Sequence, residues 1–480
     1  MAENPQMNSR DTGLGLLAMW SDEMVHDFLF RLEARDLVAL QSVSKALYVF
    51  AGHEELWRDL TVRRFAGDFW FQGTWRRTFA HSAKARQRRL DMRSDGLQGG
   101  DGDGGGGENE GEDVVRDAAT VEGIRVKGFY SDFLFQSWYC SSRRIDPGWL
   151  QVDNIERRSG LSVEEFIRQY EEPNRPVVLT DVVNQWPAFK LWTKEYLLEN
   201  FGEVTFRAEA VDITLGRYLR YANTTTDEGP IYLFDRFFCD HAPKMRDQFE
   251  VPPYFREDLF SVVGPNGSER PDYRWLIMGP ARSGSTFHKD PNSTSAWNAV
   301  ITGSKKWILY PPEIVPPGVF PSQDGAEVTT SVSLMEWFAN FYPHTQGATG
   351  SAKPIECICR AGELMFIPNG WWHTVLNLEE SIAITQNYVS GRNLRNVLNF
   401  IHDCGDQVSG YRGTESLHSK FVRGLEDAGH GEALRRIQEQ DESEAKALLE
   451  SKVWDKLKSP DTGSTFSFGF DLEAADSEEN

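Results

Sequence analysis

Three side chains in the C-terminal half of the chain have the types and spacing of a metal site. In "STFHKDPNSTSAWNAVITGSKKWILYPP" (residues 285–312), His288 and Asp290 lie two positions apart. Side chains alternate along a β-strand, so both would project from one face, about 7 Å apart at their Cα atoms. The best candidate for a third ligand is His373 in "GELMFIPNGWWHTVLNL". An isolated His-x-Asp is more often an ordinary polar pair, so the assignment depends on its surroundings.

Two histidines and one carboxylate predict a particular metal chemistry. They would leave three positions open on one face of the ion, which suits non-haem Fe(II) with a bidentate cosubstrate and O2. Lys305 lies on the next apolar stretch, "KKWILYPP", and a lysine near a barrel interior is costly unless it is paired with an anion. A dicarboxylate bound to the metal at one end would offer its far carboxylate to Lys305, so 2-oxoglutarate is the expected cosubstrate. Lys306 should point the opposite way and be solvated.

Short β-strands are expected to position these residues. From about residue 205 to 390, apolar runs are separated by Gly, Pro and Asn-Gly turns, as in an antiparallel barrel or jelly roll. Asn369-Gly370 is a strong hairpin signal that would present His373 on a second strand. Other residues in this region are expected to have mainly structural roles. Cys357 and Cys359 should be packing residues, Trp371 and Trp372 barrel packing and pocket wall, and His241 and His344 loop residues. Asp235 and Arg236 are candidates for the lining of a substrate mouth.

Two long stretches now point to a family. "YRWLIMGPARSGSTFHKDPNSTSAWNAVITGSKKW" and "PNGWWHTVLNLEESIAITQNYVS" follow its pattern with little interruption. Residues 125–395 resemble the JmjC (Jumonji C) 2-oxoglutarate oxygenases, in particular those that hydroxylate lysine or demethylate arginine. The resemblance implies Fe(II), 2-oxoglutarate and O2, and a basic substrate such as a histone or splicing factor. It makes His288, Asp290 and His373 the iron ligands, and Tyr232, Ser285, Asn298, Lys305 and Thr385 the cosubstrate contacts. At 285 the related sequences have threonine, so this chain keeps the hydroxyl and lacks a methyl group.

The N-terminal segment, residues 13–93, is expected to be helical. Apolar residues recur at helical spacing through Met24, Phe28 and Leu29, and again through Leu37, Leu40, Val43 and Leu47. Ser21 should cap the first helix. The segment resembles an F-box, with Leu17, Asp22, Glu23, Leu37, Val43, Leu56 and Trp57 at the motif positions and Trp20 where that family usually has proline. The resemblance implies a Skp-type adaptor of a cullin-RING ubiquitin ligase as partner, with the JmjC body binding the target. A plain helical hairpin packed on that body is the alternative.

Composition limits the classes of protein. The chain of 480 residues has a formal net charge of −21, which argues against general coating of nucleic acid and favours a basic peptide substrate. The basic stretch "KARQRRLDMR" is interpreted as a solvated helix end, with a nuclear localisation signal or a nucleic-acid contact such as RNA as the alternative. Five scattered cysteines suggest a reducing compartment. With no apolar run long enough for a membrane span and no signal sequence, we expect a nuclear protein, also compatible with the cytoplasm.

The predicted fold class is α+β: a double-stranded β-helix (jelly-roll, cupin-like barrel) with flanking helices, joined to a small all-α domain. Residues 94–118 form an acidic, Gly-rich linker between the helical segment and the catalytic body. Helices are expected over residues 396–457, where they could pair two copies into a homodimer. An acidic tail at 458–480 has too little apolar content to be confidently ordered.

Overall fold

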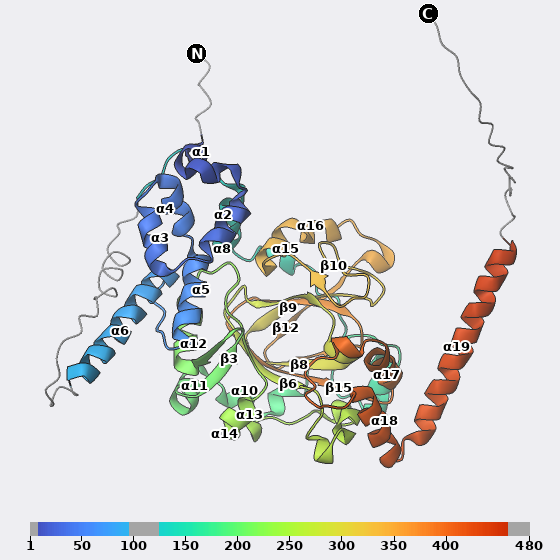
Figure 1. The fold of residues 1–480 in the computed structure, drawn as a ribbon. Coiled ribbons are helices and arrows are strands. Elements are labelled where there is room, and N and C mark those ends of the chain that lie inside the picture. Colours follow the sequence, from blue (N-terminus) through green and yellow to red (C-terminus); the bar gives the residue numbers. More distant parts are fainter. Residues whose placement is uncertain (1–7, 96–123, 459–480) are drawn as a thin grey trace, which may run out of the picture. The chain divides into compact units, whose positions relative to one another are not determined.

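The computed structural model describes residues 8–95 and 124–458 (Figure 1). Contacts divide the chain into two compact units, Met1–His418 and Ser419–Asn480. The predicted linker falls almost entirely between the described ranges, and the predicted acidic tail follows them, so both lie outside the described residues apart from their first positions. No helix within the described ranges is long and apolar enough to cross a membrane.

Two sheets form the centre of the first unit (Figure 1). Apart from the parallel pair β1–β2, their strands pair antiparallel, as expected for a jelly roll. The larger sheet has the order β1 (Arg157–Arg158), β2 (Val177–Leu179), β13 (Leu364–Ile367), β8 (Ser295–Thr302), β15 (Ser381–Tyr388), β6 (Arg274–Gly279), β5 (Leu233–Asp235), β3 (Thr205–Ala208), β4 (Val211–Thr214). The smaller has β12 (Ile355–Arg360), β9 (Ser304–Tyr310), β14 (Trp372–Asn377), β7 (Gly284–His288), and a separate ribbon pairs β10 (Phe320–Pro321) with β11 (Val328–Thr329).

The alternation of side chains along β9 explains how the smaller sheet is buried on both faces. Trp307 and Leu309 belong to one hydrophobic cluster, which also contains the larger sheet's Val300. Ile308 and Tyr310 belong to a different cluster, together with residues of α15 (Leu334–Asn340). Cys357 and Cys359 on β12 are fully buried in the first cluster, so their prediction as packing residues is confirmed.

The prediction that Lys306 is solvated is wrong. Its side chain is fully buried, and its ammonium pairs with Glu356 at 2.7 Å and donates a hydrogen bond to the carbonyl of Val152 at 2.6 Å. Lys306 does point away from Lys305 along the alternating strand. The outer face of the strand is covered by protein, however, because the segment containing Val152 passes over it.

The predicted hairpin at Asn369-Gly370 is also wrong. Strand β13 pairs with β2 and β8 of the larger sheet, whereas β14 pairs with β7 and β9 of the smaller one. Gly370 has a φ of 74°, so the dipeptide does make the turn that its residues favour. The chain uses this turn to cross from one sheet to the other, and β14, which carries His373, begins two residues after Gly370.

Six α-helices occupy most of the N-terminal segment, for which residues 13–93 were predicted to be helical: α1 (Ser9–Leu14), α2 (Asp22–Leu29), α3 (Ala34–Gln41), α4 (Lys45–Ala51), α5 (Glu54–Phe65) and α6 (Trp75–Asp95). The Ser21 hydroxyl accepts a hydrogen bond from the backbone N–H of Met24, which confirms the predicted cap. The predicted apolar stripe is only partly buried. Leu29, Leu37 and Leu47 are in the core, but Met24, Phe28 and Val43 are exposed.

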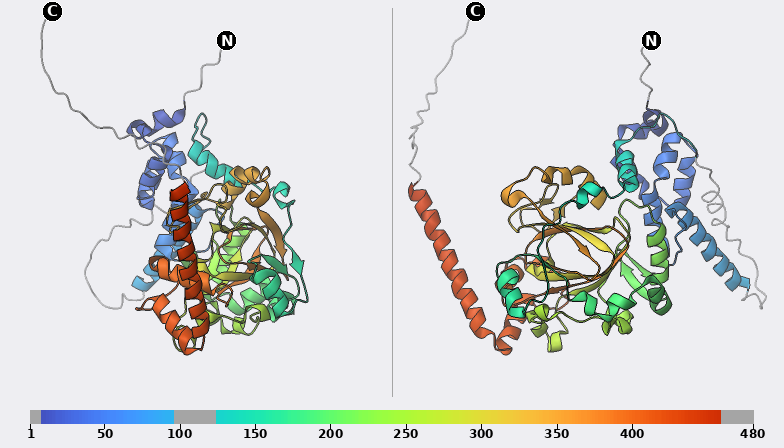
Figure 2. Two further views of the ribbon diagram at one scale, coloured as in Figure 1. Left: turned by 90° about the vertical axis from the view of Figure 1, so that its right-hand side faces the viewer. Right: turned by 180° about the vertical axis from the view of Figure 1, so that it is seen from behind.

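These helices pack against the sheets as part of the same unit (Figure 2). The rings of Phe71 and Trp75 contact Tyr221 on α12 (Leu215–Thr224), and the Trp75 indole N–H donates to the Asp227 carboxylate at 2.9 Å. Gly67 has a φ of 88°, and a Cβ there would lie 1.9 Å from the carbonyl oxygen of Asp212. One hydrophobic core therefore runs from the N-terminal helices to the outer face of the larger sheet.

The other helices border the sheets or follow them. They are α8 (Asp132–Ser142), α9 (Val163–Phe166), α10 (Pro187–Leu191), α11 (Lys194–Phe201), α13 (Phe238–His241), α14 (Pro243–Arg246), α16 (Tyr342–Thr345) and α17 (Leu394–Asp403). Helix α18 (Leu417–Asp427) begins at the boundary of the units, and α19 (Gly431–Lys458) belongs to the second. Helices α17, α18 and α19 lie within or overlap the range 396–457 in which helices were predicted.

Candidate metal and cosubstrate site

His288, Asp290 and His373 come together between the two sheets. His288 ends β7 and lies directly opposite His373 of β14 in the strand register, with ring centroids 4.2 Å apart. Asp290 was expected on the same strand, but β7 ends at His288, and Asp290 is the residue before the short helix at Pro291–Ser293. The chain nevertheless turns its carboxylate toward the histidines, and one ligand atom from each residue lies within 4.8 Å of the others.

The hydrogen bonds of the two imidazole rings leave one nitrogen of each available to a metal. His288 Nδ1 lies 2.7 Å from the carbonyl oxygen of Thr286, and His373 Nδ1 lies 3.1 Å from that of Trp371. A carbonyl oxygen can only accept, so Nδ1 carries the proton in both rings and Nε2 keeps its lone pair. This orientation of a ligand by a backbone carbonyl is usual for metal-binding histidines. The Trp307 ring stacks on His373 with a centroid distance of 5.9 Å.

The buried carboxylate of Asp290 fits a cation. Asn387 donates a hydrogen bond to Oδ1 at 3.2 Å, but Oδ2 is buried without a hydrogen-bond partner. Burial raises the pKa of Asp290, and burial together with neighbouring His288 lowers the pKa of His373. A divalent cation would compensate the carboxylate and accept both nitrogen lone pairs. Two histidines and one carboxylate on one face of the ion suit Fe(II) with open positions for other ligands.

Lys305 is a buried cation without an anionic partner. Its side chain is fully buried on β9, and Nζ donates to Asn377 Oδ1 at 2.8 Å and to the Tyr232 hydroxyl at 3.2 Å. Among the described residues no carboxylate forms an ion pair with it, whereas the neighbouring Lys306 is paired with Glu356 at 2.7 Å. Burial lowers the pKa of Lys305 to about 7. A carboxylate of a bound dicarboxylic acid would supply the missing charge.

The remaining predicted cosubstrate residues line the cavity that contains the metal cluster. This cavity of about 1160 Å³ is bordered by Tyr232, Ser285, Asn298 and Thr385, as well as by all three candidate ligands. Asn298 Oδ1 is buried without a partner, and Thr385 Oγ1 donates to the carbonyl oxygen of Trp297 at 3.0 Å. Asn298 and Thr385 are opposite one another on β8 and β15. Lys305 is not among the residues that border the cavity, but its ammonium group reaches the hydroxyl of Tyr232, which does border it.

Three residues of the site were missed in the sequence: Trp307, Asn377 and Asn387. The signal was present in the alternation of the strands. Asn377 is four positions after His373 on β14, and Asn387 is two after Thr385 on β15, so each pair shares a face. Asn377 holds Lys305, and Asn387 holds Asp290.

Other residues considered in the sequence lie outside the cavity. Asp235 is fully buried and accepts hydrogen bonds from the backbone N–H groups of Arg207 and Phe237. With Arg236 it borders a second cavity, which shares Phe234 and Trp275 with the first, so their place at a substrate mouth stays a prediction. Arg236 pairs with Asp272 at 2.6 Å. Trp371 and Trp372 pack against protein in two different places, the first with its indole N–H on the carbonyl of Asn174. Neither borders the cavity, so only their packing role is confirmed. Within the described ranges, His241 and His344 belong to no metal-ligating cluster.

Comparisons with known proteins agree with this geometry. Residues 200–392 match the model of a cupin-like domain. The chain is 47% identical to the arginine-specific demethylase JMJ22 of Arabidopsis thaliana over 97% of its own length and 86% of that protein. It is 36% identical to the bifunctional arginine demethylase and lysyl-hydroxylase psr-1 of Caenorhabditis elegans, over 50% of this chain and 63% of that protein.

The name of a human relative states which cofactor and cosubstrate that protein requires. The 2-oxoglutarate and iron-dependent oxygenase JMJD4 of Homo sapiens is 30% identical to this chain, over 53% of the chain and 65% of that protein. The relatives, the match to a cupin-like domain and the two largely antiparallel sheets all indicate the same fold and the same family. The chain belongs to the JmjC family of 2-oxoglutarate and iron-dependent oxygenases, enzymes that use Fe(II), 2-oxoglutarate and O2.

Proposed function

We propose that this oxygenase acts on basic side chains of a protein, hydroxylating lysine or demethylating arginine or lysine in histones or other nuclear proteins. His288, Asp290 and His373 would hold the iron, and Lys305 and Tyr232 would bind the far carboxylate of 2-oxoglutarate. With these groups bound, decarboxylation of 2-oxoglutarate by O2 gives succinate and CO2 and places one oxygen atom in a substrate C–H bond. Asn387 would orient the Asp290 carboxylate, and Asn377 would orient the Lys305 ammonium.

The carbon that receives oxygen determines the product. Hydroxylation of a side-chain methylene gives a stable alcohol. Hydroxylation of an N-methyl group gives a hemiaminal, which breaks its C–N bond and releases formaldehyde. Both outcomes need the same iron and cosubstrate residues, so the shape and charge of the cavity beside them must choose the substrate.

The acidic lining of the cavity is the observation that supports a basic substrate. Five carboxylates border it in addition to Asp290, and the two guanidinium groups present, Arg58 and Arg282, are already occupied. Arg58 pairs with Glu209 at 3.0 Å and donates to the carbonyl of Gly229 at 2.8 Å, and Arg282 donates to backbone carbonyls. The acidic residues are Glu54, Glu55, Glu209, Asp227 and Glu228.

Glu228 is the carboxylate best placed to benefit from a cationic guest. It accepts a hydrogen bond from Ser333 at 2.8 Å, and burial raises its pKa. A lysine or arginine side chain entering the cavity would stabilise its charge. The printed names of JMJ22 and psr-1 give arginine demethylation and lysyl hydroxylation as the activities of those relatives, which fits a positively charged substrate in this cavity.

Mass spectrometry of basic peptides tests the proposal. Methylated and unmethylated lysine and arginine peptides would be incubated with enzyme, Fe(II) and 2-oxoglutarate. We expect succinate together with a gain of one oxygen or the loss of one methyl group. The His288→Ala variant should form no succinate, and unchanged turnover in that variant would contradict the assignment. Glu228→Gln should raise KM for the peptide without changing KM for 2-oxoglutarate.

A second candidate function is that of a substrate adaptor in a cullin-RING ubiquitin ligase. Three large apolar side chains among the first helices and their connecting turns are exposed: Leu16, Met19 and Val43 are 89%, 87% and 68% exposed. Together with the F-box resemblance, they would suit docking of a Skp-type adaptor. The two functions are compatible, because this surface is separate from the residues that border the cavity.

Surface substitutions test the adaptor proposal better than removal of a helix, because Leu37 and Leu47 belong to the core. Leu16→Asp combined with Val43→Asp should abolish co-purification of a Skp-type adaptor while oxygenase activity is kept. Phe320→Asp is a matched control, since Phe320 is 64% exposed on the catalytic body and does not border the cavity. If the adaptor is absent from the wild-type preparation, or remains bound to the double variant, this second function is wrong.

Nuclear localisation would be carried by the end of α6. Arg86, Arg88 and Arg89 lie in this helix, within the stretch "KARQRRLDMR", and Arg88 and Arg89 are exposed. Replacement of Arg88 and Arg89 by glutamine should shift a fluorescently labelled full-length protein from the nucleus to the cytoplasm. A wild-type protein that is itself excluded from the nucleus would contradict the proposal.

A further inference from the structure

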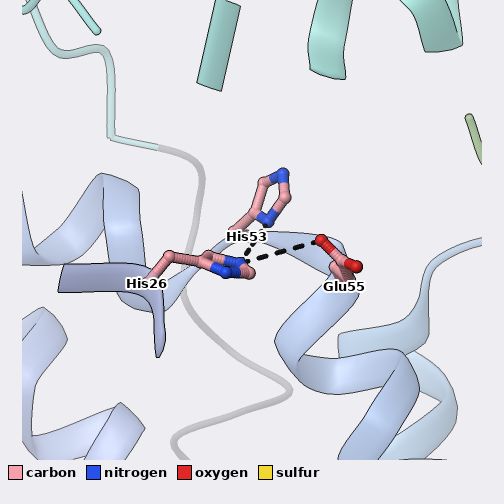
Figure 3. Close-up of side chains that lie close together, drawn as sticks. All are labelled: His26, His53 and Glu55. Carbon is pink, nitrogen blue, oxygen red and sulfur yellow. Dashed lines mark hydrogen bonds and ion pairs between the residues drawn. The ribbon is translucent and has the colours of Figure 1, made fainter. Parts of the chain in front are cut away.

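A second cluster of two histidines and one carboxylate lies among the N-terminal helices (Figure 3). His26 is on α2, whereas His53 precedes the first residue of α5 and Glu55 is in its first turn. Within the described residues, this cluster and the one at His288 are the groups with metal-ligating composition and spacing. None of its three residues is a candidate iron ligand or cosubstrate contact, although Glu55 also borders the cavity.

The donor atoms converge on one point. His26 Nε2 lies 3.0 Å from His53 Nδ1 and 3.9 Å from Glu55 Oε2, and the dashed lines in Figure 3 run from the His26 ring to both partners. In a tetrahedral zinc site with Zn–N distances of about 2.0–2.1 Å, donor atoms are separated by about 3.3 Å. The two nitrogens would need to move apart by about 0.3 Å, and the carboxylate would close by about 0.6 Å. Glu55 can make that movement, because its side chain is 53% exposed.

Both rings are in the protonation state that a metal requires. Burial lowers the pKa of His26, and burial together with His26 lowers the pKa of His53 to about 4. At 3.0 Å, one ring nitrogen must donate a proton and the other must accept it, so at least one of the two facing nitrogens has a free lone pair. On binding of a cation, that proton would move to the other nitrogen of its own ring, so both rings would stay neutral. His26 would then carry its proton on Nδ1 and His53 on Nε2.

The surroundings resemble those of a protein metal centre with one open position. The rings of Phe30 and Phe133 pack on His26 with centroid distances of 5.4 and 5.1 Å, which gives the ligand an apolar shell. His53 and Glu55 border the same cavity as the iron cluster, so a fourth coordination position would be reached by water. Three protein ligands with an open fourth position are a common zinc arrangement.

We propose that His26, His53 and Glu55 form a second metal site that takes Zn2+ and fastens α2 to the start of α5. Imidazole nitrogen and carboxylate oxygen are ordinary zinc ligands, whereas the iron cluster has an additional anchor for a chelating dicarboxylate that this cluster lacks. The inference does not depend on the proposed substrate.

Zinc binding by the full-length protein tests the proposal, with the iron site removed so that it cannot take up the probe. The His288→Ala/His373→Ala variant would be stripped of metal, dialysed against ZnCl2 with a weak competing chelator, and analysed for bound zinc. We expect one equivalent. Adding Glu55→Gln should weaken zinc binding at least tenfold, and this residue is exposed enough that the fold should be unaffected. Adding His26→Ala should abolish binding.

A matched histidine pair supplies the control. His402 and His418 have ring centroids 4.9 Å apart, and His402 lies beside the Asp403 carboxylate, but His402 is largely exposed. His402→Ala in the same background should leave zinc binding unchanged. Zinc should also raise the melting temperature of the background variant and not that of the Glu55→Gln form. The proposal would be overturned if the background variant bound no zinc, or if adding Glu55→Gln or His26→Ala left its zinc binding unchanged. The two histidines would then share only a hydrogen bond.

Discussion

At the scale of single residues, Lys305 links the metal cluster to the choice of cosubstrate. A fully buried ammonium group held by Asn377 and Tyr232 lacks an anion among its described neighbours. Lys305→Met should remove the charge that binds the far carboxylate, at a cost of about 2–5 kcal/mol. KM for 2-oxoglutarate should therefore rise by about 30-fold or more, while Fe(II) affinity, measured by anaerobic dialysis, should stay unchanged. An unaltered KM would show that Lys305 does not bind the cosubstrate.

The lowered pKa of Lys305 gives the cosubstrate affinity a pH dependence of known sign. In the free enzyme this pKa is about 7, so the ammonium form predominates below that pH and is lost above it. Binding of a dianion above pH 7 must be accompanied by uptake of a proton, and KM for 2-oxoglutarate should rise about tenfold per pH unit there. The Lys305→Arg form, which stays charged, is the comparison and should lack this rise. A flat profile in the wild-type enzyme would contradict the prediction.

The reactive residues could be predicted from the sequence, but their supporting residues could not. His288 and Asp290 are neighbours in the chain, and the resemblance indicates His373 and Lys305. Asn387 and Asn377 act through contacts with residues 97 and 72 positions away. Alternation places them on the correct face of a strand, but it does not reveal which side chain of the other strand they meet.

At the scale of elements, the Lys306–Glu356 pair shows what covers the smaller sheet. Removing one member leaves the other charge buried and unpaired, whereas replacing both by apolar residues removes the need for pairing. Lys306→Met should therefore lower the free energy of unfolding by about 3–5 kcal/mol. The Lys306→Met/Glu356→Leu double variant should recover most of this loss in chemical denaturation. Equal stability of the single variant and the wild type would mean that the outer face of β9 is open to water.

The Asn369-Gly370 dipeptide correctly predicted a turn, but it did not predict which strands pair on either side of that turn. Asn369-Gly370 does make a turn, yet its flanking strands join different sheets. A dipeptide favours the backbone conformation of its own turn, and pairing depends on which partners bury the flanking side chains. The same limit applies to Lys306, because alternation predicts its direction and not the segment that lies over it.

At the scale of the whole molecule, the N-terminal helices and the sheets share one core. Helical spacing predicted the helices, but it could not show that Trp75 and Phe71 would pack on Tyr221 of the catalytic body. We expect the first unit to unfold cooperatively for this reason. Trp75→Ala should destabilise both parts together by about 3–5 kcal/mol.

Calorimetry together with cosubstrate binding checks this coupling. One transition, at which helix content and 2-oxoglutarate binding are lost together, is expected for the wild-type chain, and Trp75→Ala should move that single transition downward. Leu198→Ala is a suitable control, because Leu198 is 42% exposed on a helix of the same unit. Two separate transitions, with only the helical one sensitive to Trp75, would show that the helices and the sheets fold independently.

The most direct test of the account is anomalous diffraction at the iron edge, from crystals grown without oxygen in the presence of Fe(II) and 2-oxoglutarate. We predict an iron peak within bonding distance of His288 Nε2, Asp290 and His373 Nε2. Density for 2-oxoglutarate should run from this iron toward Lys305 and Tyr232. A site among these three residues that stays without iron, or a cosubstrate whose far carboxylate turns away from Lys305, would contradict the assignment.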